Sequence, residues 1–265
     1  MQVIDIHSHI FTDNGADRGW GIPTAPPGPV GLADYLRGIR ASRLGRGGRM
    51  VIYPGTDLDR LADDPDAGRR ANELAASLVA LDPKRLILGF SPDPHHLEAT
   101  LAQMEGWVKV RGARIIGEIV PYIGHYEREG AAMDAIYEQA VALDVPINHH
   151  ASTEEDTAAV ARLAARHPRA RIIMAHVGGT WNFRNGLAVA RAHDNVWTDT
   201  SGWVMVAGGS MEIALRELGP SKLVFGIDYP LCDINTWLAR LQRLPLSEEG
   251  RERIAWRNAA ELMKL

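Results

Sequence analysis

Histidine and acidic residues stand at the ends of several apolar segments, where they could together bind a divalent cation. Imidazole and carboxylate groups without thiolate suit zinc, with manganese, iron and nickel as alternatives. A bound cation of this kind lowers the pKa of its water to about 7, which would supply hydroxide for hydrolysis. The candidate ligands are His7, His9, Glu118, one of the neighbours His149 and His150, His176 and Asp228.

His7 and His9 are two residues apart at the end of the first apolar segment. On a strand, residues i and i+2 point to the same side, so both imidazoles could bind one cation. Histidines at a strand end also serve as polar caps, so this pair alone leaves both interpretations open. Ligands at four further segment ends favour a metal site.

Apolar, β-branched segments alternate along the chain with segments of helical periodicity, a pattern typical of a parallel sheet with crossover helices. The predicted strands are Val3–His7, Met50–Tyr53, Leu86–Phe90, Ile115–Val120, Val145–His149, Ile172–His176, Val196–Asp199 and Leu223–Ile227. The predicted helices are Leu32–Arg43, Ala67–Leu81, Leu97–Val110, Ala131–Leu143, Glu155–His167, Leu187–His193, Met211–Leu218 and Ile234–Leu241.

Eight strand-then-helix units in 265 residues predict an α/β fold, a (β/α)8 TIM barrel that forms a single catalytic domain over residues 1–265. The alternative is a doubly wound open sheet, which would carry a Gly-rich phosphate loop after the first strand. Asp5–His9 stands in that position, so the barrel is favoured. The Pro/Gly-rich segment Gly21–Gly31 is predicted to be a loop over the barrel mouth and a candidate lid.

Two of the candidate ligands have plausible structural roles instead. Glu118, within an apolar strand, could pair with Arg114, Lys109 or Arg111. Asp228 could cap the helix that follows it. If Asp228 contacts both the cation and its water, it can instead carry the proton from the attacking water to the leaving group.

The sequence resembles the metal-dependent hydrolases of the amidohydrolase superfamily. More narrowly, it is similar to the branch that includes aminocarboxymuconate semialdehyde decarboxylase and related decarboxylases. The resemblance runs in order from residue 3 to residue 262. It rests on the segments Val3–Ile10, Pro146–Ala151, Ile172–Gly179, Leu223–Pro230 and Arg257–Leu262.

The resemblance implies that His7, His9, His150 and Asp228 bind a first cation. His176 would bind a second cation, or act as an acid/base if there is one cation only. The family pattern selects His150 as the ligand, so His149 should face the helix layer. Glu118 resembles the bridging glutamate of two-metal TatD-type and phosphotriesterase-like members.

The amino-acid composition limits the classes of partner that the protein is expected to bind. The net charge of -4 and the absence of a Lys/Arg block argue against nucleic acid or a membrane as the main partner, which favours a small-molecule substrate. Cys232 is the only cysteine, which excludes an internal disulfide. A cytoplasmic protein is expected, and whether it forms a homo-oligomer is left open.

These features lead to a hydrolase for a small-molecule amide, lactone or ester, in which metal-activated water attacks the carbonyl and Asp228 and His176 are catalytic. The alternative is a metal-dependent non-oxidative decarboxylase. It predicts one cation, tolerance of Glu118→Gln and a basic residue at the mouth. A third interpretation, a metal-holding binding protein, would be removed by turnover of any substrate.

Overall fold

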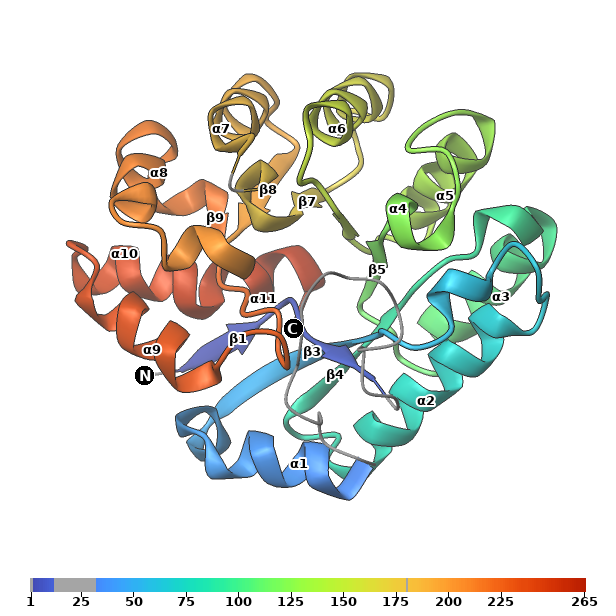
Figure 1. The fold of residues 1–265 in the computed structure, drawn as a ribbon, viewed down its shortest axis with the longest axis horizontal. Helices are drawn as coiled ribbons and strands as arrows, with labels where there is room; N and C mark the ends of the chain where they lie inside the picture. The colour runs from blue at the N-terminus through green and yellow to red at the C-terminus, as the bar shows by residue number, and fades with distance from the viewer. Residues whose placement is uncertain (1, 12–31, 180) are drawn as a thin grey trace.

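The computed structural model describes residues 2–11, 32–179 and 181–265, in which a ring of parallel strands is surrounded by helices (Figure 1). The strands are β1 Val3–Asp5, β2 His9–Ile10, β3 Gly48–Pro54, β4 Leu86–Phe90, β5 Ile115–Ile119, β6 Ile147–His149, β7 Ile172–Met174, β8 Val196–Asp199 and β9 Leu223–Val224. The main path of the sheet runs from β1 through β3 in chain order to β9, and β2 continues the pairing with β3. The predicted TIM-barrel fold is therefore confirmed. The candidate lid Gly21–Gly31 lies outside the described residues.

Hydrogen bonds between the first and last strand segments close the sheet. The Ile6 N–H donates to the Phe225 carbonyl at 3.0 Å, and the Asp228 N–H donates to the His7 carbonyl at 2.7 Å. Closure places the first strand β1 beside the last strand β9. His7 and Asp228, which follow these strands, are therefore neighbours at the mouth of the barrel.

The helices that cover the strands agree closely with the predicted ones. They are α1 Leu32–Ala41, α2 Ala67–Leu81, α3 Leu97–Lys109, α5 Ala131–Ala142, α6 Glu154–Arg166, α7 Phe183–Ala192, α8 Ser210–Leu218 and α9 Ile234–Arg243. A short α4, Pro121–Gly124, follows β5 at the mouth. Within the described ranges, no helix combines the length and the apolar character needed to cross a membrane.

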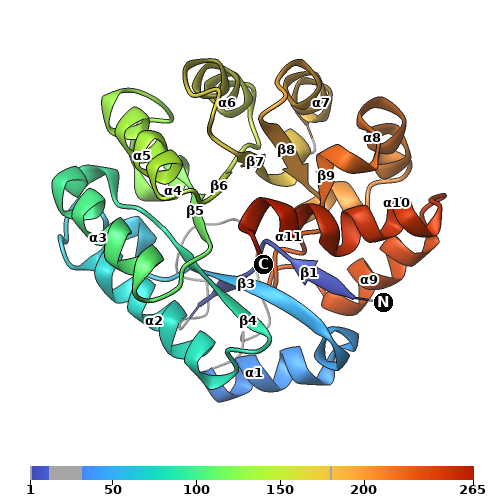
Figure 2. The same cartoon turned by 180° about the vertical axis from the view of Figure 1, so that it is seen from behind.

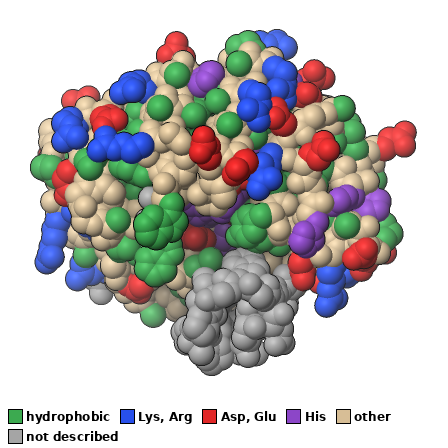
Figure 3. All heavy atoms as spheres, turned by 45° about the horizontal axis from the view of Figure 1, so that its top comes forward, with side chains coloured by type: hydrophobic (Ala, Val, Ile, Leu, Met, Phe, Trp, Pro, Cys, Tyr) green, Lys and Arg blue, Asp and Glu red, His purple; other side chains and the backbone are tan. Residues whose placement is uncertain are grey.

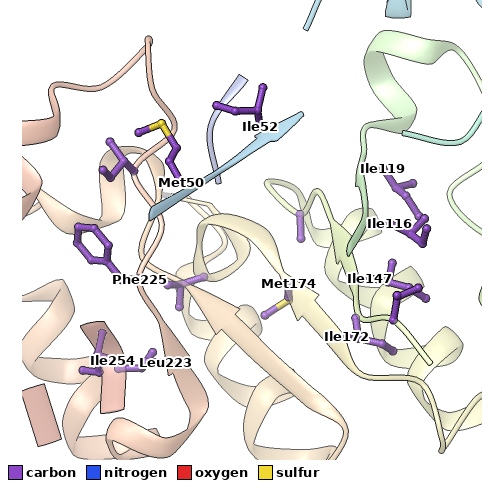
Figure 4. Packing of buried hydrophobic residues seen from close by; sticks show 14 of the residues in the cluster. Met50, Ile52, Ile116, Ile119, Ile147, Ile172, Met174, Leu223, Phe225 and Ile254 are labelled. Atoms are coloured by element: carbon purple, nitrogen blue, oxygen red, sulfur yellow. The ribbon is translucent and has the colours of Figure 1, made fainter. Parts of the chain in front are cut away.

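Alternate residues of the strands face two separate apolar layers. Met50 and Ile52 of β3 belong to the large cluster between strands and helices, part of which Figure 4 shows. Val51 and Tyr53 belong to the cluster inside the barrel. Both faces of each strand are thus covered, which explains why the strands are apolar throughout.

The C-terminal segment closes the end of the barrel opposite the mouth. It contains α10 Glu248–Glu252 and α11 Asn258–Met263 (Figure 2). Neither helix was predicted from the sequence. Leu262 and Met263 of α11 pack into the interior cluster. The bottom of the barrel is therefore sealed by apolar side chains, and only the mouth carries the polar cluster.

Candidate metal centre

All six predicted ligands lie together at the carboxyl ends of the strands. His7 follows β1, His9 lies in β2, Glu118 in β5, His150 follows β6, His176 follows β7 and Asp228 follows β9. All of them except the fully buried His7 line a depression, and histidine and acidic atoms are visible between hydrophobic side chains in it (Figure 3). Chain segments far apart in sequence thus supply one compact polar cluster.

The first donor set surrounds one oxygen of Glu118. The Nε2 atoms of His7 and His9 are 3.1 Å apart, and they lie 3.3 Å and 3.2 Å from Glu118 Oε2. Asp228 Oδ1 lies 3.8 Å from the first Nε2 and 3.6 Å from the second. Ligand atoms of His7, His9 and Glu118 thus lie within 4.8 Å of one another, and Asp228 lies close to both histidines.

The second donor set surrounds the other oxygen of Glu118. His150 Nδ1 lies 3.0 Å and His176 Nε2 lies 3.5 Å from Glu118 Oε1, and these two nitrogens are 3.3 Å apart. The structure thus places His150 beside His176 at this oxygen, and the His176 ring also lies close to that of His7, with centroids 4.9 Å apart. The carboxylate lies between two pairs of imidazoles.

The electrostatics of the cluster fit a bound cation. Burial opposes ionisation of Glu118, but the charge of His7 and hydrogen bonds from His150 and His176 hold the pKa of Glu118 well below its usual range. Burial would lower the pKa of His7, yet Glu118 and Asp199 raise it well above the usual value. Ligands about 2.0–2.2 Å from a tetrahedral ion lie about 3.3 Å from one another, which matches most of the distances above. Divalent cations can therefore take the place of the protons that otherwise balance these carboxylates.

A β-bulge turns Glu118 into the mouth. Ile116 and Ile119 both face the helices, and the pairing of β5 with β6 shifts register between them. In an undisturbed strand Glu118 would share the outward side of Ile116. Gly117 has φ of +135°, and a Cβ there would lie 2.4 Å from the Asn148 carbonyl oxygen, so only glycine fits this bulge.

Replacing Gly117 by alanine should therefore destabilise the protein by about 2–4 kcal/mol and lower its metal content, because the side chain forces the bulge and Glu118 to move. Chemical denaturation and elemental analysis measure the two effects. Gly106→Ala, in α3 with open space around the new Cβ, should instead stabilise by about 0.5–1 kcal/mol. Equal stabilities for the two variants would contradict this explanation of the bulge.

The segment that carries His176 differs from the prediction. The expected strand Ile172–His176 ends at Met174, and His176 and Val177 lie in a turn with φ of 60° and 52°. The His176 N–H donates to Asp199 Oδ1 at 2.9 Å, which stabilises the left-handed backbone of this turn. A strand pattern alone does not reveal such a turn, because it depends on a side chain from β8.

Asp199 is a buried residue of the site that the sequence analysis did not select. Its Oδ2 lies 2.8 Å from His7 Nδ1, and it also accepts hydrogen bonds from Asn148 and Ser201. Burial raises the pKa of Asp199, but the charges of His7 and His176 and hydrogen bonds from His7 and Ser201 outweigh it and lower the pKa to about 2. The available signal was the position of Asp199 as the last residue of a predicted apolar strand.

Three histidines outside the cluster have partners within the scaffold. His149 faces α5, as expected, with Nδ1 2.8 Å from the Tyr137 hydroxyl, and burial lowers its pKa to about 4. His95 lies 2.8 Å from the Gly124 carbonyl oxygen, and His167 lies 2.6 Å from Asp134. These contacts support structural roles.

The mouth opens into a cavity of about 450 Å³ with aromatic walls. Tyr122, Trp181 and Trp203 line it, and the two tryptophans are 98% and 74% exposed. No described residue that lines this cavity or the adjoining one over Glu118 is lysine or arginine. Arg184, close in sequence, pairs with Glu217. The basic residue expected for a decarboxylase is thus absent from the described lining.

Comparison with known proteins agrees with this architecture. A family model described as amidohydrolase matches residues 4–265. The chain belongs to the amidohydrolase family. The resemblance read from the sequence segments is therefore confirmed, whereas a search of curated proteins gives no match.

Solved structures similar to this amidohydrolase-family chain cover its whole length. The 2,6-dihydroxybenzoate decarboxylase from Rhizobium is 17% identical, with a TM-score of 0.74 over 100% of this chain and 99% of that one. The 5-carboxyvanillate decarboxylase from Sphingomonas paucimobilis is 15% identical, with a TM-score of 0.74 over 100% and 99%. The 5-carboxyvanillate decarboxylase from Novosphingobium aromaticivorans, complexed with manganese and 4-hydroxy-3-methoxy-5-nitrobenzoic acid, is 14% identical, with a TM-score of 0.78 over 100% and 96%.

These neighbours correct the predicted reaction. The ligand types predict hydrolysis of an amide, lactone or ester, but the activities named for these structures are decarboxylations. They correspond to the alternative expectation. The physical reason for the error is that imidazole and carboxylate ligands serve a cation equally well in either reaction.

Proposed function

We propose that this chain is a metal-dependent non-oxidative decarboxylase of a small aromatic carboxylate, with residues 1–265 as one catalytic domain. The observation that carries the proposal is a buried histidine–carboxylate cluster at the base of a cavity with aromatic walls. Its barrel is similar, over the whole chain, to decarboxylases of carboxylated phenols. Aromatic walls suit a planar ring, and a bound cation would neutralise the substrate carboxylate in place of an arginine.

We propose two adjacent cation sites that share Glu118. His7, His9 and Asp228 would complete the first, and His150 and His176 the second. Manganese, named with some of the similar decarboxylases, is our choice over zinc because carboxylate oxygens suit it. A bound cation supplies a Lewis acid that holds and polarises the substrate carboxylate.

Asp228 is the proposed proton carrier. Decarboxylation breaks the bond between the ring carbon and the carboxylate, carbon dioxide leaves, and the electron pair on the ring carbon takes up a proton. Asp228 lines both the cavity over Glu118 and the aromatic cavity, and its side chain is the most exposed carboxylate of the cluster. It can therefore give a proton to the ring carbon and regain one from solvent.

The proposal is tested by incubating manganese-loaded protein with 2,6-dihydroxybenzoate, 5-carboxyvanillate and other carboxylated phenols. We expect the matching phenol without its carboxyl group, detected by chromatography, and no product after chelation. Methyl esters and anilides of the same acids form the counter-screen. Hydrolysis of those compounds without loss of any carboxyl group would contradict the proposal.

Trp181 and Trp203 should bind the substrate ring. Replacing either by alanine should raise KM about 2- to 10-fold with little change in kcat, because aromatic contacts contribute about 0.5–1.5 kcal/mol. Val206→Ala is the control, since Val206 is exposed but lies outside the cavity lining. Steady-state kinetics would refute the assignment if all three variants behaved alike.

A further inference from the structure

Two histidines of the cluster turn the same ring nitrogen toward one buried pair of residues. His7 Nδ1 lies 2.8 Å from Asp199 Oδ2 and 3.2 Å from Ser201 Oγ. His176 Nδ1 lies 2.9 Å from the same Ser201 Oγ. Both Nε2 atoms consequently face Glu118, at 3.3 Å and 3.5 Å from its two oxygens. The pair Asp199–Ser201 therefore contacts one histidine from each donor set.

The hydrogen-bond partners determine which ring nitrogen of His7 and of His176 carries the proton. The donors that point at the Asp199 carboxylate are His7 Nδ1, Asn148 Nδ2, the His176 and Ser201 backbone N–H groups and the Ser201 hydroxyl. Oδ2 of the ionised carboxylate has two lone pairs, one for Asn148 Nδ2 and one for His7, so His7 carries its proton on Nδ1. The single Ser201 hydroxyl proton goes to Asp199, which leaves the serine lone pairs to accept a proton from His176 Nδ1.

We propose that Asp199 and Ser201 are positioning residues that hold His7 and His176 in the Nδ1–H tautomer, with both Nε2 lone pairs directed at the cation sites. A hydrogen-bonded carboxylate behind a metal-binding imidazole fixes the ring and raises its basicity. Here one carboxylate serves two histidines, the first directly and the second through a serine. The inference rests on the proposed metal centre, but the tautomers can be observed without metal or substrate.

The surrounding structure makes this pair rigid. Asp199 and Ser201 are fully buried, and Asp199 ends β8 while Ser201 begins the turn after it. Gly202 follows with φ of +70°, and a Cβ there would lie 3.0 Å from His176 Nδ1, so the backbone approaches the ring closely. The backbone at Gly202 therefore limits the movement of the His176 ring.

The test is the ring-nitrogen spectrum of metal-free protein labelled with 15N-histidine, assigned by comparison with H7Q and H176Q. At a pH high enough that both rings are neutral, we expect His7 and His176 to show protonated Nδ1 and unprotonated Nε2. Asp199→Asn should change this pattern for both rings and raise the Kd for Mn²⁺, measured from the free-ion electron paramagnetic resonance signal, about 10- to 100-fold. Ser201→Ala should alter His176 more than His7.

Thr198→Val is the matched control, since Thr198 is the buried neighbour of Asp199. Its hydroxyl donates to the Met174 carbonyl of β7 and not to a residue of the cluster. It should leave both the tautomers and the Kd for Mn²⁺ within twofold of the parent. A neutral ring of either histidine in the parent protein that carries its proton on Nε2 would overturn the proposal. So would Asp199→Asn and Ser201→Ala variants that match Thr198→Val in both measurements. If Asp199→Asn fails to fold, the parent spectrum and Ser201→Ala decide. A Kd effect without any decarboxylation would sustain this inference while removing the proposed reaction.

Discussion

Replacing Glu118 by glutamine should lower the metal content from about two ions per chain to about one or fewer, with affinity reduced more than about 100-fold. Glu118 offers Oε2 to His7 and His9 and Oε1 to His150 and His176. A glutamine side chain keeps the shape but presents one oxygen and one NH2 group, which repels a cation. Elemental analysis after purification without chelator gives the count, and activity should fall below about 1% of the parent.

Glu105→Gln is the control for Glu118→Gln, because Glu105 is exposed on α3 and pairs only with Lys109 among the described contacts. It should change neither metal content nor activity. Tolerance of Glu118→Gln, which the sequence analysis attached to the decarboxylase alternative, is not expected, because all four histidines of the cluster contact this carboxylate. A single ion per chain in both the parent and Glu118→Gln would contradict the shared-ligand arrangement.

Replacing Asp228 by asparagine should reduce decarboxylation about 10³-fold, since proton transfer from a positioned side chain contributes about 10²–10⁴-fold. Asparagine retains an oxygen for the cation near His7 and His9 but cannot deliver a proton. We therefore expect most of the metal to remain bound while kcat falls. Single-turnover experiments with elemental analysis on the same samples separate the two effects.

Asp233→Asn provides the comparison for Asp228→Asn. Asp233 lies in the same loop, where its side chain caps α9 by accepting from the Thr236 N–H at 2.7 Å. That variant should cost at most about 1 kcal/mol of stability and leave kcat unchanged. If Asp228→Asn retained full activity, the proton would have to come from another group and the proposed role would be wrong.

The fold could be predicted from the sequence because the strands and the helices of the barrel each have a characteristic pattern of apolar residues. Strands such as Leu86–Phe90 are apolar on both faces, and helices such as Ala67–Leu81 have the length and periodicity to cover them. The terminal helix α11 was missed. Its role is to seal the barrel through Leu262 and Met263, and that role depends on closure of the ring, which no local pattern contains.

The candidate site could be predicted only as a set of residue types at strand ends. The inward turn of Glu118 depends on the bulge at Gly117, and the turn at His176 depends on Asp199 from the next strand. Asp199 itself was not predicted because it contacts Nδ1 of His7, whereas Nε2 of that ring faces the proposed cation sites. Such contacts join residues far apart in sequence, so spacing within one segment does not indicate them.

The most direct test of the proposed decarboxylase uses an aromatic acid labelled with ¹³C at its carboxyl carbon, incubated in D2O with protein of known manganese content. We predict that labelled carbon dioxide appears in the headspace and that one deuterium replaces the carboxyl group on the ring. The rate should rise with bound metal and vanish after chelation. Unlabelled headspace with intact acid across the carboxylated phenols, at full metal occupancy, would contradict the account.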